Sequence, residues 1–217
     1  MALRHPEDPK LHYRLGLAYT AQERPQKAAA SFARAVERDT LFAEACEKLG
    51  IYSVKRKFDA DLPEADLLSV IHELNDDPAI HGILVQLPLP GQIDEGRALT
   101  TIDPSKDIDG LHPVNLGKLL RGESGFLPCT PHGVQQLLLR SGIEISGKHV
   151  VIVGRSTLVS KPLAGILLQK KPDANATVTL CHTGTPNIAS FTRRADILVV
   201  AAGGPKTITA DMVSQGA

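Results

Sequence analysis

The stretch GKHVVIVGRSTLVSKPLAGILLQ, residues 147–169, decides the fold of this chain. Its first apolar run ends at Gly154, and a second apolar segment with helical spacing follows, so the stretch predicts a strand, a glycine turn and a helix. At such a turn, backbone N–H groups and the helix dipole face a bound phosphate. Gly154, Arg155 and Ser156 are therefore candidate dinucleotide-binding residues, although a strand-turn-helix without any ligand fits the same pattern.

The segments on either side of this stretch alternate in the same way. Two further apolar strands are predicted in ATVTLCHT (176–183) and ADILVVAAGG (195–204), with a helix between them. Upstream, the pattern predicts a helix at about 63–75, a short buried strand at 82–87 and a helix with Thr130 as its N-cap. Strands that alternate with helices indicate an α/β protein with a parallel, doubly wound sheet.

The end of the predicted strand at 176–183 bears on the choice of dinucleotide. It reads CHT, with no Asp or Glu to bind a ribose 2′-hydroxyl. His182 and Thr183 offer hydrogen-bond donors there, and Arg155 and Ser156 add positive charge and a hydroxyl at the neighbouring turn. These four residues favour NADP over NAD.

Composition excludes several classes of function. The 217 residues are 42% hydrophobic, enough for one large domain or two small ones with a buried core. The 24 basic residues balance 24 acidic ones without a basic block, which predicts no nucleic-acid partner. No apolar run approaches the roughly 18 residues that span a bilayer, which indicates a soluble, cytoplasmic protein. Cys46, Cys129 and Cys181 lack C-x-x-C spacing, so we expect reduced, mostly buried thiols and no metal site.

The N-terminal segment at about 8–41 resembles a single tetratricopeptide repeat, with two helix-period segments joined by a polar turn. One repeat cannot bury its apolar face alone, so it must pack on the rest of the chain or on a protein partner. A capping hairpin and a peptide-binding module are both open interpretations. The matching positions are Leu15, Gly16 and Tyr19 in the first helix and Ala28, Phe32 and Ala35 in the second.

Three other stretches together resemble the bifunctional methylenetetrahydrofolate dehydrogenase/methenyltetrahydrofolate cyclohydrolase family. They are GILVQLPLP (82–90), DPSKDIDGLHPVNLGKLLRGESGFLPCTPHGV (103–134) and GKHVVIVGRSTLVSKPLAGILL (147–168). The resemblance implies hydride transfer from methylenetetrahydrofolate to NADP and then hydrolysis of the methenyl product to 10-formyltetrahydrofolate. It also implies a small-molecule folate substrate and a homodimer.

The resemblance runs from about residue 45 to residue 217 and implies the domain organisation. We expect a helical hairpin at 1–41, an incomplete α/β catalytic, folate-binding domain at 42–146 and a truncated Rossmann-type NADP-binding domain at 147–217. An incomplete sheet would leave an open edge. A fused or truncated reading frame would also explain why the hairpin is joined to the family-like segment near Thr40 and why the sequence stops at Ala217.

Two residues take a substrate-side role from the resemblance. Asp109 lies in a turn, where Asp often bonds to its own backbone, but the matching Asp of the family holds the pterin ring. From the sequence alone, Gln86 could simply bond to loop backbone, whereas the matching Gln of the family contacts a catalytic Lys. Ser160 replaces the family's usual Gly, so a bulkier turn is expected, and Thr183 replaces its usual Ser.

The family's catalytic Lys and Tyr have no match here. Counting back from EACEKLGI (44–51), the Lys position is Phe42 and the Tyr position is Arg38. Loss of a positioned proton-transfer group costs about 100- to 10,000-fold in rate, so cyclohydrolase activity is expected to be nearly absent. Three hypotheses follow: a working enzyme, an impaired relative that binds folate or NADP, and an interaction module built on the hairpin.

Overall fold

The computed structural model describes residues 50–216 of a chain that divides into two compact units, Met1–Asp59 and Ala60–Ala217. Residues 50–59 are the described part of the first unit, and they contain no helix or strand. The hairpin predicted at 8–41, together with Arg38 and Phe42, lies outside the described residues.

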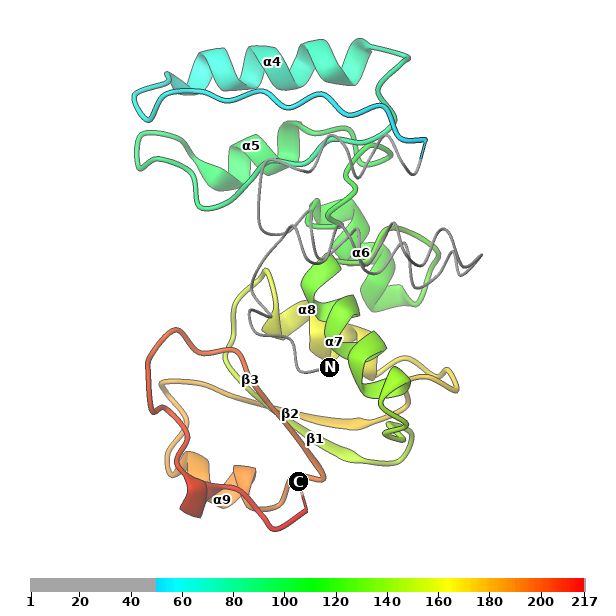
Figure 1. Ribbon diagram of the computed structural model, residues 1–217, viewed down its shortest axis with the longest axis vertical. Coiled ribbons are helices and arrows are strands. Elements are labelled where there is room, and N and C mark those ends of the chain that lie inside the picture. Colours follow the sequence, from blue (N-terminus) through cyan, green and yellow to red (C-terminus); the bar gives the residue numbers. More distant parts are fainter. Residues whose placement is uncertain (1–49, 217) are drawn as a thin grey trace, which may run out of the picture. The chain divides into compact units, whose positions relative to one another are not determined.

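The second unit contains four helices followed by alternating strands and helices, which confirms the α/β prediction (Figure 1). This alternation begins at the strand predicted after residue 147. In chain order the elements are α4 (Glu64–Asp76), α5 (Glu95–Thr101), α6 (Pro113–Arg121), α7 (Cys129–Arg140), β1 (His149–Val153), α8 (Ser160–Leu167), β2 (Thr177–Cys181), α9 (Ile188–Thr192), β3 (Ile197–Val200) and the 3-10 helix η1 (Ala210–Met212).

The three strands form one parallel sheet in the order β2-β1-β3. The central strand β1 is paired on both edges, and its Val151 lies opposite Thr179 of β2 and Leu198 of β3. Val150, Val151 and Ile152 are 0% exposed. A run of buried β-branched residues is typical of a parallel strand covered on both faces, so the sequence pattern of β1 was sufficient to place it.

Helices cover both faces of this sheet (Figure 1). Val150 and Ile152 point to the face where Leu163 and Leu167 of α8 pack, together with apolar residues of α7. The alternate residues of β1 point to the other face, where Phe191 of α9 packs. The period-two alternation of β1 therefore distributes its side chains between two helical layers.

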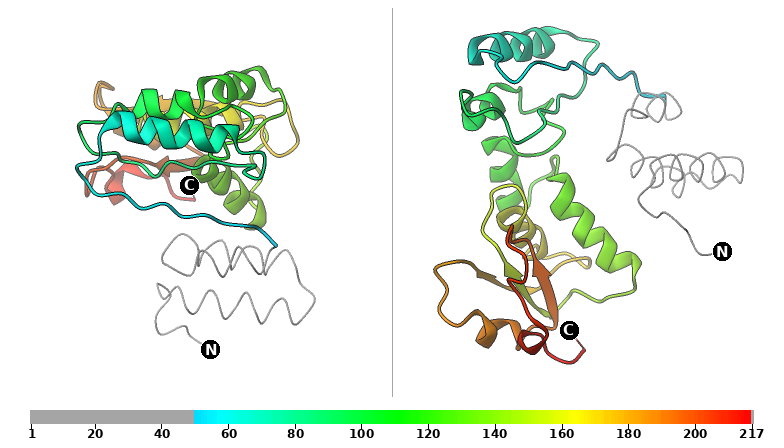
Figure 2. Two further views of the ribbon diagram at one scale, coloured as in Figure 1. Left: turned by 90° about the horizontal axis from the view of Figure 1, so that it is seen from above. Right: turned by 60° about the vertical axis from the view of Figure 1, so that its left-hand side comes forward.

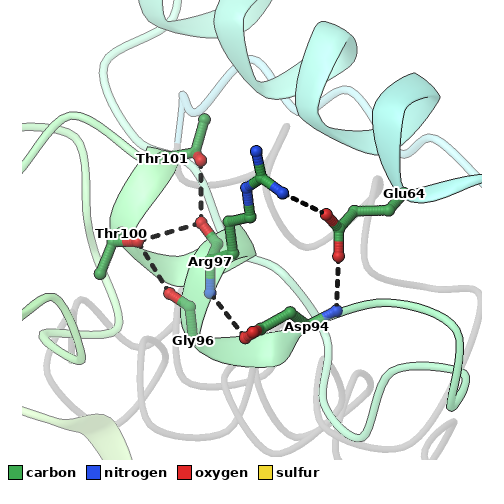
Figure 3. Close-up of polar contacts among 6 residues, drawn as sticks. All are labelled: Glu64, Asp94, Gly96, Arg97, Thr100 and Thr101. Carbon is green, nitrogen blue, oxygen red and sulfur yellow. Dashed lines mark hydrogen bonds and ion pairs between the residues drawn. The ribbon is translucent and has the colours of Figure 1, made fainter.

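Helices α4 and α5 form a separate layer, and side-chain hydrogen bonds connect the two helices (Figures 2 and 3). The Glu64 carboxylate accepts from Asp94 N at 2.8 Å and from Arg97 Nη1 at 3.0 Å. Asp94 in turn caps α5 by accepting from Arg97 N at 3.0 Å. The layer is filled by a buried apolar cluster of Leu67, Ile71, Ile83, Ile93, Ala98 and Ile102.

The predicted buried strand at 82–87 is wrong. Within the described residues its sheet pairing is limited to one bridge between Ile83 and Asp107. Ile83 packs into the α4 and α5 cluster, whereas Leu84 is 50% exposed. A buried parallel strand needs neighbouring strands for its backbone groups, and a single bridge does not supply them.

Two helix predictions differ in accuracy. Helix α4 lies within one residue of the predicted 63–75. Helix α7 begins at Cys129 with Pro128 as its N-cap, so the prediction of Thr130 as the cap is wrong. The reason is that Pro128 O already accepts from His132 N at 3.0 Å, which places Thr130 inside the first turn.

Lys106 closes the carboxyl end of α4. Its Nζ donates to Leu74 O at 3.0 Å, Asn75 O at 2.6 Å and Asp77 O at 2.8 Å. The Asn75 side chain adds a bond to Thr101 O at 2.7 Å. An ammonium group here satisfies terminal carbonyls and complements the helix dipole, so it fastens the following loop to α4.

Replacing Lys106 with Met keeps the alkyl stem and removes these three N–H donors. We expect the free energy of unfolding in urea to fall by about 1–3 kcal/mol. Lys170→Met, at an exposed lysine after α8, is the control and should change it by less than about 0.5 kcal/mol. Equal losses in the two variants would contradict the capping role.

Candidate functional site

The glycine turn after β1 is closely packed. Gly154 has φ +142°, and a Cβ placed there would lie 2.6 Å from both Ala201 O and Ser160 Oγ. Gly154 N donates to Cys181 O at 2.7 Å, and Ala201 N donates to Val153 O at 2.9 Å. These bonds bring the carboxyl ends of all three strands to one edge, and only glycine fits at the turn.

Ser156 caps the start of α8. Its Oγ accepts from Val159 N at 3.1 Å and from Ser160 N at 3.3 Å, and its carbonyl accepts from Lys161 N at 3.0 Å. These three amides, which the sequence pattern offers to a phosphate, are therefore bonded to Ser156. The Arg155 and Ser156 side chains are both exposed at this edge.

The His182 turn lies at the same edge, because Gly154 N bonds to Cys181 O. His182 N donates to Thr185 Oγ1 at 2.9 Å, and Gly184 N donates to His182 Nδ1 at 3.0 Å. Since Nδ1 accepts, the neutral ring carries its proton on Nε2. Thr183 is exposed. The structure thus brings together the five residues predicted to bind a dinucleotide.

Ser160 differs from its surroundings, because its Oγ is buried without a hydrogen-bond partner among the described residues. The residue is 0% exposed and lies against Gly154. An unsatisfied buried hydroxyl costs about 1–3 kcal/mol. This hydroxyl, packed against Gly154, is the extra group that was expected to make the turn bulkier.

Asp109 lies beside the start of α7. The Cys129 thiol donates to Ile108 O at 3.8 Å, the carbonyl that precedes Asp109 in the chain. Partial desolvation of the sulfur and the nearby Asp109 carboxylate raise the pKa of Cys129 to about 11, although the residue as a whole is exposed, so near neutral pH the thiol is protonated and donates. Cys181 is buried as predicted but Cys129 is exposed, and Cys46 lies outside the described residues.

The bond to nearby turn backbone that the sequence suggested for Asp109 is made by Asp107 instead. Asp107 is 1% exposed, and its Oδ2 accepts from His112 N and from Asn115 Nδ2, both at 2.8 Å. Sequence reasoning missed Asp107, Asn115 and Cys129. The two aspartates in KDIDG were the available signal for a second important carboxylate, but their spacing alone does not tell which one is buried.

Gln86 is exposed, and its Nε2 donates to Leu87 O at 3.0 Å. This contact matches the alternative of a bond to loop backbone. The family's Lys position is Phe42 in this chain and lies outside the described residues, so the structure does not test the catalytic role implied for Gln86.

Other parts of the described chain offer little chemistry. A cavity of about 530 Å³ opens beside His149, but both ring nitrogens of that residue are bonded, to Arg194 O and to Thr179 Oγ1, each at 2.9 Å. Over residues 50–216 no group of three His, Cys, Asp or Glu side chains is placed to hold a metal ion. Over the same range, no helix has the length and apolarity to cross a membrane.

Comparison with known families gives two matches, separated by residues 110–127. Residues 27–109 match "Tetrahydrofolate dehydrogenase/cyclohydrolase, catalytic domain". Residues 128–217 match "Tetrahydrofolate dehydrogenase/cyclohydrolase, NAD(P)-binding domain". The first match begins inside the segment interpreted as a helical repeat, so part of that segment is shared with the catalytic domain.

Individual relatives agree. "Bifunctional protein FolD" of Dehalococcoides mccartyi (strain CBDB1) is 63% identical over 172 residues, which are 79% of this chain and 58% of the relative. The chain therefore spans less than two thirds of that protein. The solved FolD methylenetetrahydrofolate dehydrogenase/cyclohydrolase of Campylobacter jejuni is 37% identical with a TM-score of 0.74, over 94% of this chain and 73% of that one. The Trypanosoma brucei enzyme, complexed with NADP cofactor and inhibitor, is 33% identical with a TM-score of 0.73, over 95% and 73%.

The buried hydroxyl of Ser160 can be tested by its removal. Ser160→Ala should raise the free energy of unfolding by about 1 kcal/mol, because an unpaired polar group leaves the interior. Ser190→Ala is the control, since Ser190 Oγ donates to Asn187 O at 2.8 Å and its loss should be neutral or destabilising. Urea unfolding measures both. A fall in stability with Ser160→Ala would show that the hydroxyl has a partner.

Proposed function

The chain belongs to the tetrahydrofolate dehydrogenase/cyclohydrolase family, and we propose that it binds NADP and a reduced folate and oxidises methylenetetrahydrofolate. Hydrolysis of the methenyl product is nearly absent in this proposal. The observation that carries it is the turn at Gly154, which leaves Arg155 and Ser156 exposed at the carboxyl edge of a parallel sheet. Open α/β sheets bind their ligands at this edge.

The residues at the edge suit NADP. Arg155 and the hydroxyl hydrogen of Ser156 would contact phosphate, while His182 Nε2–H and Thr183 would contact the 2′-phosphate of the adenosine ribose. The end of β2 has no carboxylate that would select the free ribose of NAD. When bound, the nicotinamide supplies the hydride acceptor, and the chain's own residues bind and orient it.

Asp109 is the proposed contact for folate. A carboxylate can accept two parallel N–H donors from the amino-pyrimidine edge of a pterin. Its neighbour Cys129 is a donor near neutral pH, because its pKa is raised to about 11, so the thiol adds no second negative charge beside the ring. The bond from Cys129 to Ile108 O also holds the backbone next to Asp109 before the ligand binds.

Proton transfer is the step that we propose is impaired. The family's catalytic Lys and Tyr fall on Phe42 and Arg38, and neither side chain can act as the missing amine or phenol. Gln86 would then lack the Lys that its amide is proposed to contact. Hydride transfer depends mainly on positioning the two rings, so it tolerates this loss better than hydrolysis does.

Other assignments stay secondary proposals. A homodimer is proposed from the family alone. The repeat-like segment at 8–41 supports an interaction module that binds a protein, with the rest of the chain as scaffold. A catalytically inactive relative that still binds folate or NADP would retain the same ligand contacts.

Calorimetric titration with NADP and NAD tests the nucleotide proposal. We expect the chain to bind NADP more tightly than NAD, and Arg155→Ala to weaken NADP binding about tenfold or more, since one charge-assisted hydrogen bond is lost. Arg140→Ala, at an exposed arginine in the last turn of α7, is the control and should leave both affinities unchanged. Absence of detectable NADP binding by the wild-type chain would refute the proposal.

A further inference from the structure

The loop that carries Asp109 is held from inside by a buried polar network. Asp107 Oδ2 accepts from His112 N and from Asn115 Nδ2, both at 2.8 Å. Asn115 Nδ2 donates a second bond to Pro104 O at 2.9 Å. Asp107 and Asn115 are 1% and 2% exposed, so these bonds are shielded from water and loss of one leaves a partner unsatisfied.

Asn115 reaches this network from α6, which is an independent element. Its two partners, Pro104 O and the Asp107 carboxylate, both precede Asp109 in the chain, whereas α6 follows Asp109. One amide group thereby fastens the segment before the turn to the helix after it. A buried side chain that joins a loop segment to a helix in this way acts as a clamp on the loop's shape.

A second contact fixes the far side of the same loop. Gly110 has φ +65°, and a Cβ there would lie 2.8 Å from Phe126 O and 2.9 Å from Leu127 C. The turn is therefore pressed against the segment that leads into α7. The Cys129 thiol at the start of that helix donates to Ile108 O, the carbonyl that precedes Asp109, at 3.8 Å, so the turn that carries Asp109 lies against Cys129.

We propose that Asn115 is a positioning residue: through Asp107 it holds the turn in the shape that keeps Asp109 against Cys129 and presents its carboxylate to folate. The effect on folate rests on the proposed function, whereas the effect on Asp109 and Cys129 does not. Without the amide, Asp107 loses a donor and Pro104 O loses its partner, so the turn relaxes. A shift of about 1 Å in a positioning group is enough to weaken recognition of a ligand severely.

The test compares Asn115→Ala with a matched control, Gln135→Ala. Gln135 is also a buried amide, 4% exposed, whose Nε2 donates to a backbone carbonyl, Asp173 O, at 2.8 Å. Asp109→Asn is the positive control, because it removes the carboxylate beside the thiol. The first readout is the rate of Cys129 alkylation by iodoacetamide at pH 8, followed by mass spectrometry of the peptide so that other cysteines do not contribute. The second is the affinity for tetrahydrofolate by calorimetry.

We expect Cys129 alkylation to rise at least about threefold in Asn115→Ala and in Asp109→Asn, because each unit by which the thiol pKa falls gives about tenfold more thiolate. Gln135→Ala should react at the wild-type rate even where its unfolding midpoint falls equally. Tetrahydrofolate affinity should fall about tenfold in Asn115→Ala and stay unchanged in Gln135→Ala.

Equal alkylation rates in Asn115→Ala and Gln135→Ala would overturn the positioning role. Failure of the wild-type chain to bind tetrahydrofolate would instead overturn the proposed folate site, and the alkylation rates would still decide the role of Asn115. A loss of folate affinity that is equal in the two alanine variants would also count against it, because it would follow stability rather than the position of Asp109.

Discussion

Close packing at the carboxyl end of β1 is the constraint on which the nucleotide-binding half depends. Gly154 meets Ala201 O and Ser160 Oγ so closely that no Cβ fits, and its N–H bonds to Cys181 O. These contacts hold the ends of the three strands together and set where α8 starts. Arg155 and His182 lie at one edge for this reason, although they are far apart in the sequence.

The part of the chain that carries Asp109 is held differently. Its sheet pairing in the described residues is a single bridge at Ile83, and long side chains supply much of the order instead. Lys106 closes α4 and Asn115 clamps the loop before α6, each by bonding to several backbone or buried groups. Because each clamp is one residue, the geometry of this site is sensitive to single substitutions.

The sequence predicted the sheet better than it predicted the Asp109 loop. Strand β1 was recognisable because its buried run and glycine turn are local features, whereas the segment at 82–87 has the same apolar run but lacks neighbouring strands to pair with. Asp107 and Asn115 could not be found, since their importance depends on a contact across a turn. The clustering of His182 with Gly154 followed from parallel strand order, which the alternation of elements already indicated.

In the proposed function, ligand binding would depend on residues that the chain retains, while proton transfer would depend on the positions occupied by Arg38 and Phe42. The rate of methenyltetrahydrofolate hydrolysis, monitored as the loss of its absorbance, separates ligand binding from proton transfer most directly. The wild-type chain should stay within about tenfold of the rate in buffer, and Arg38→Tyr/Phe42→Lys should be about 100-fold faster or more. A wild-type rate equal to that of the Dehalococcoides mccartyi relative, measured side by side, would contradict this division.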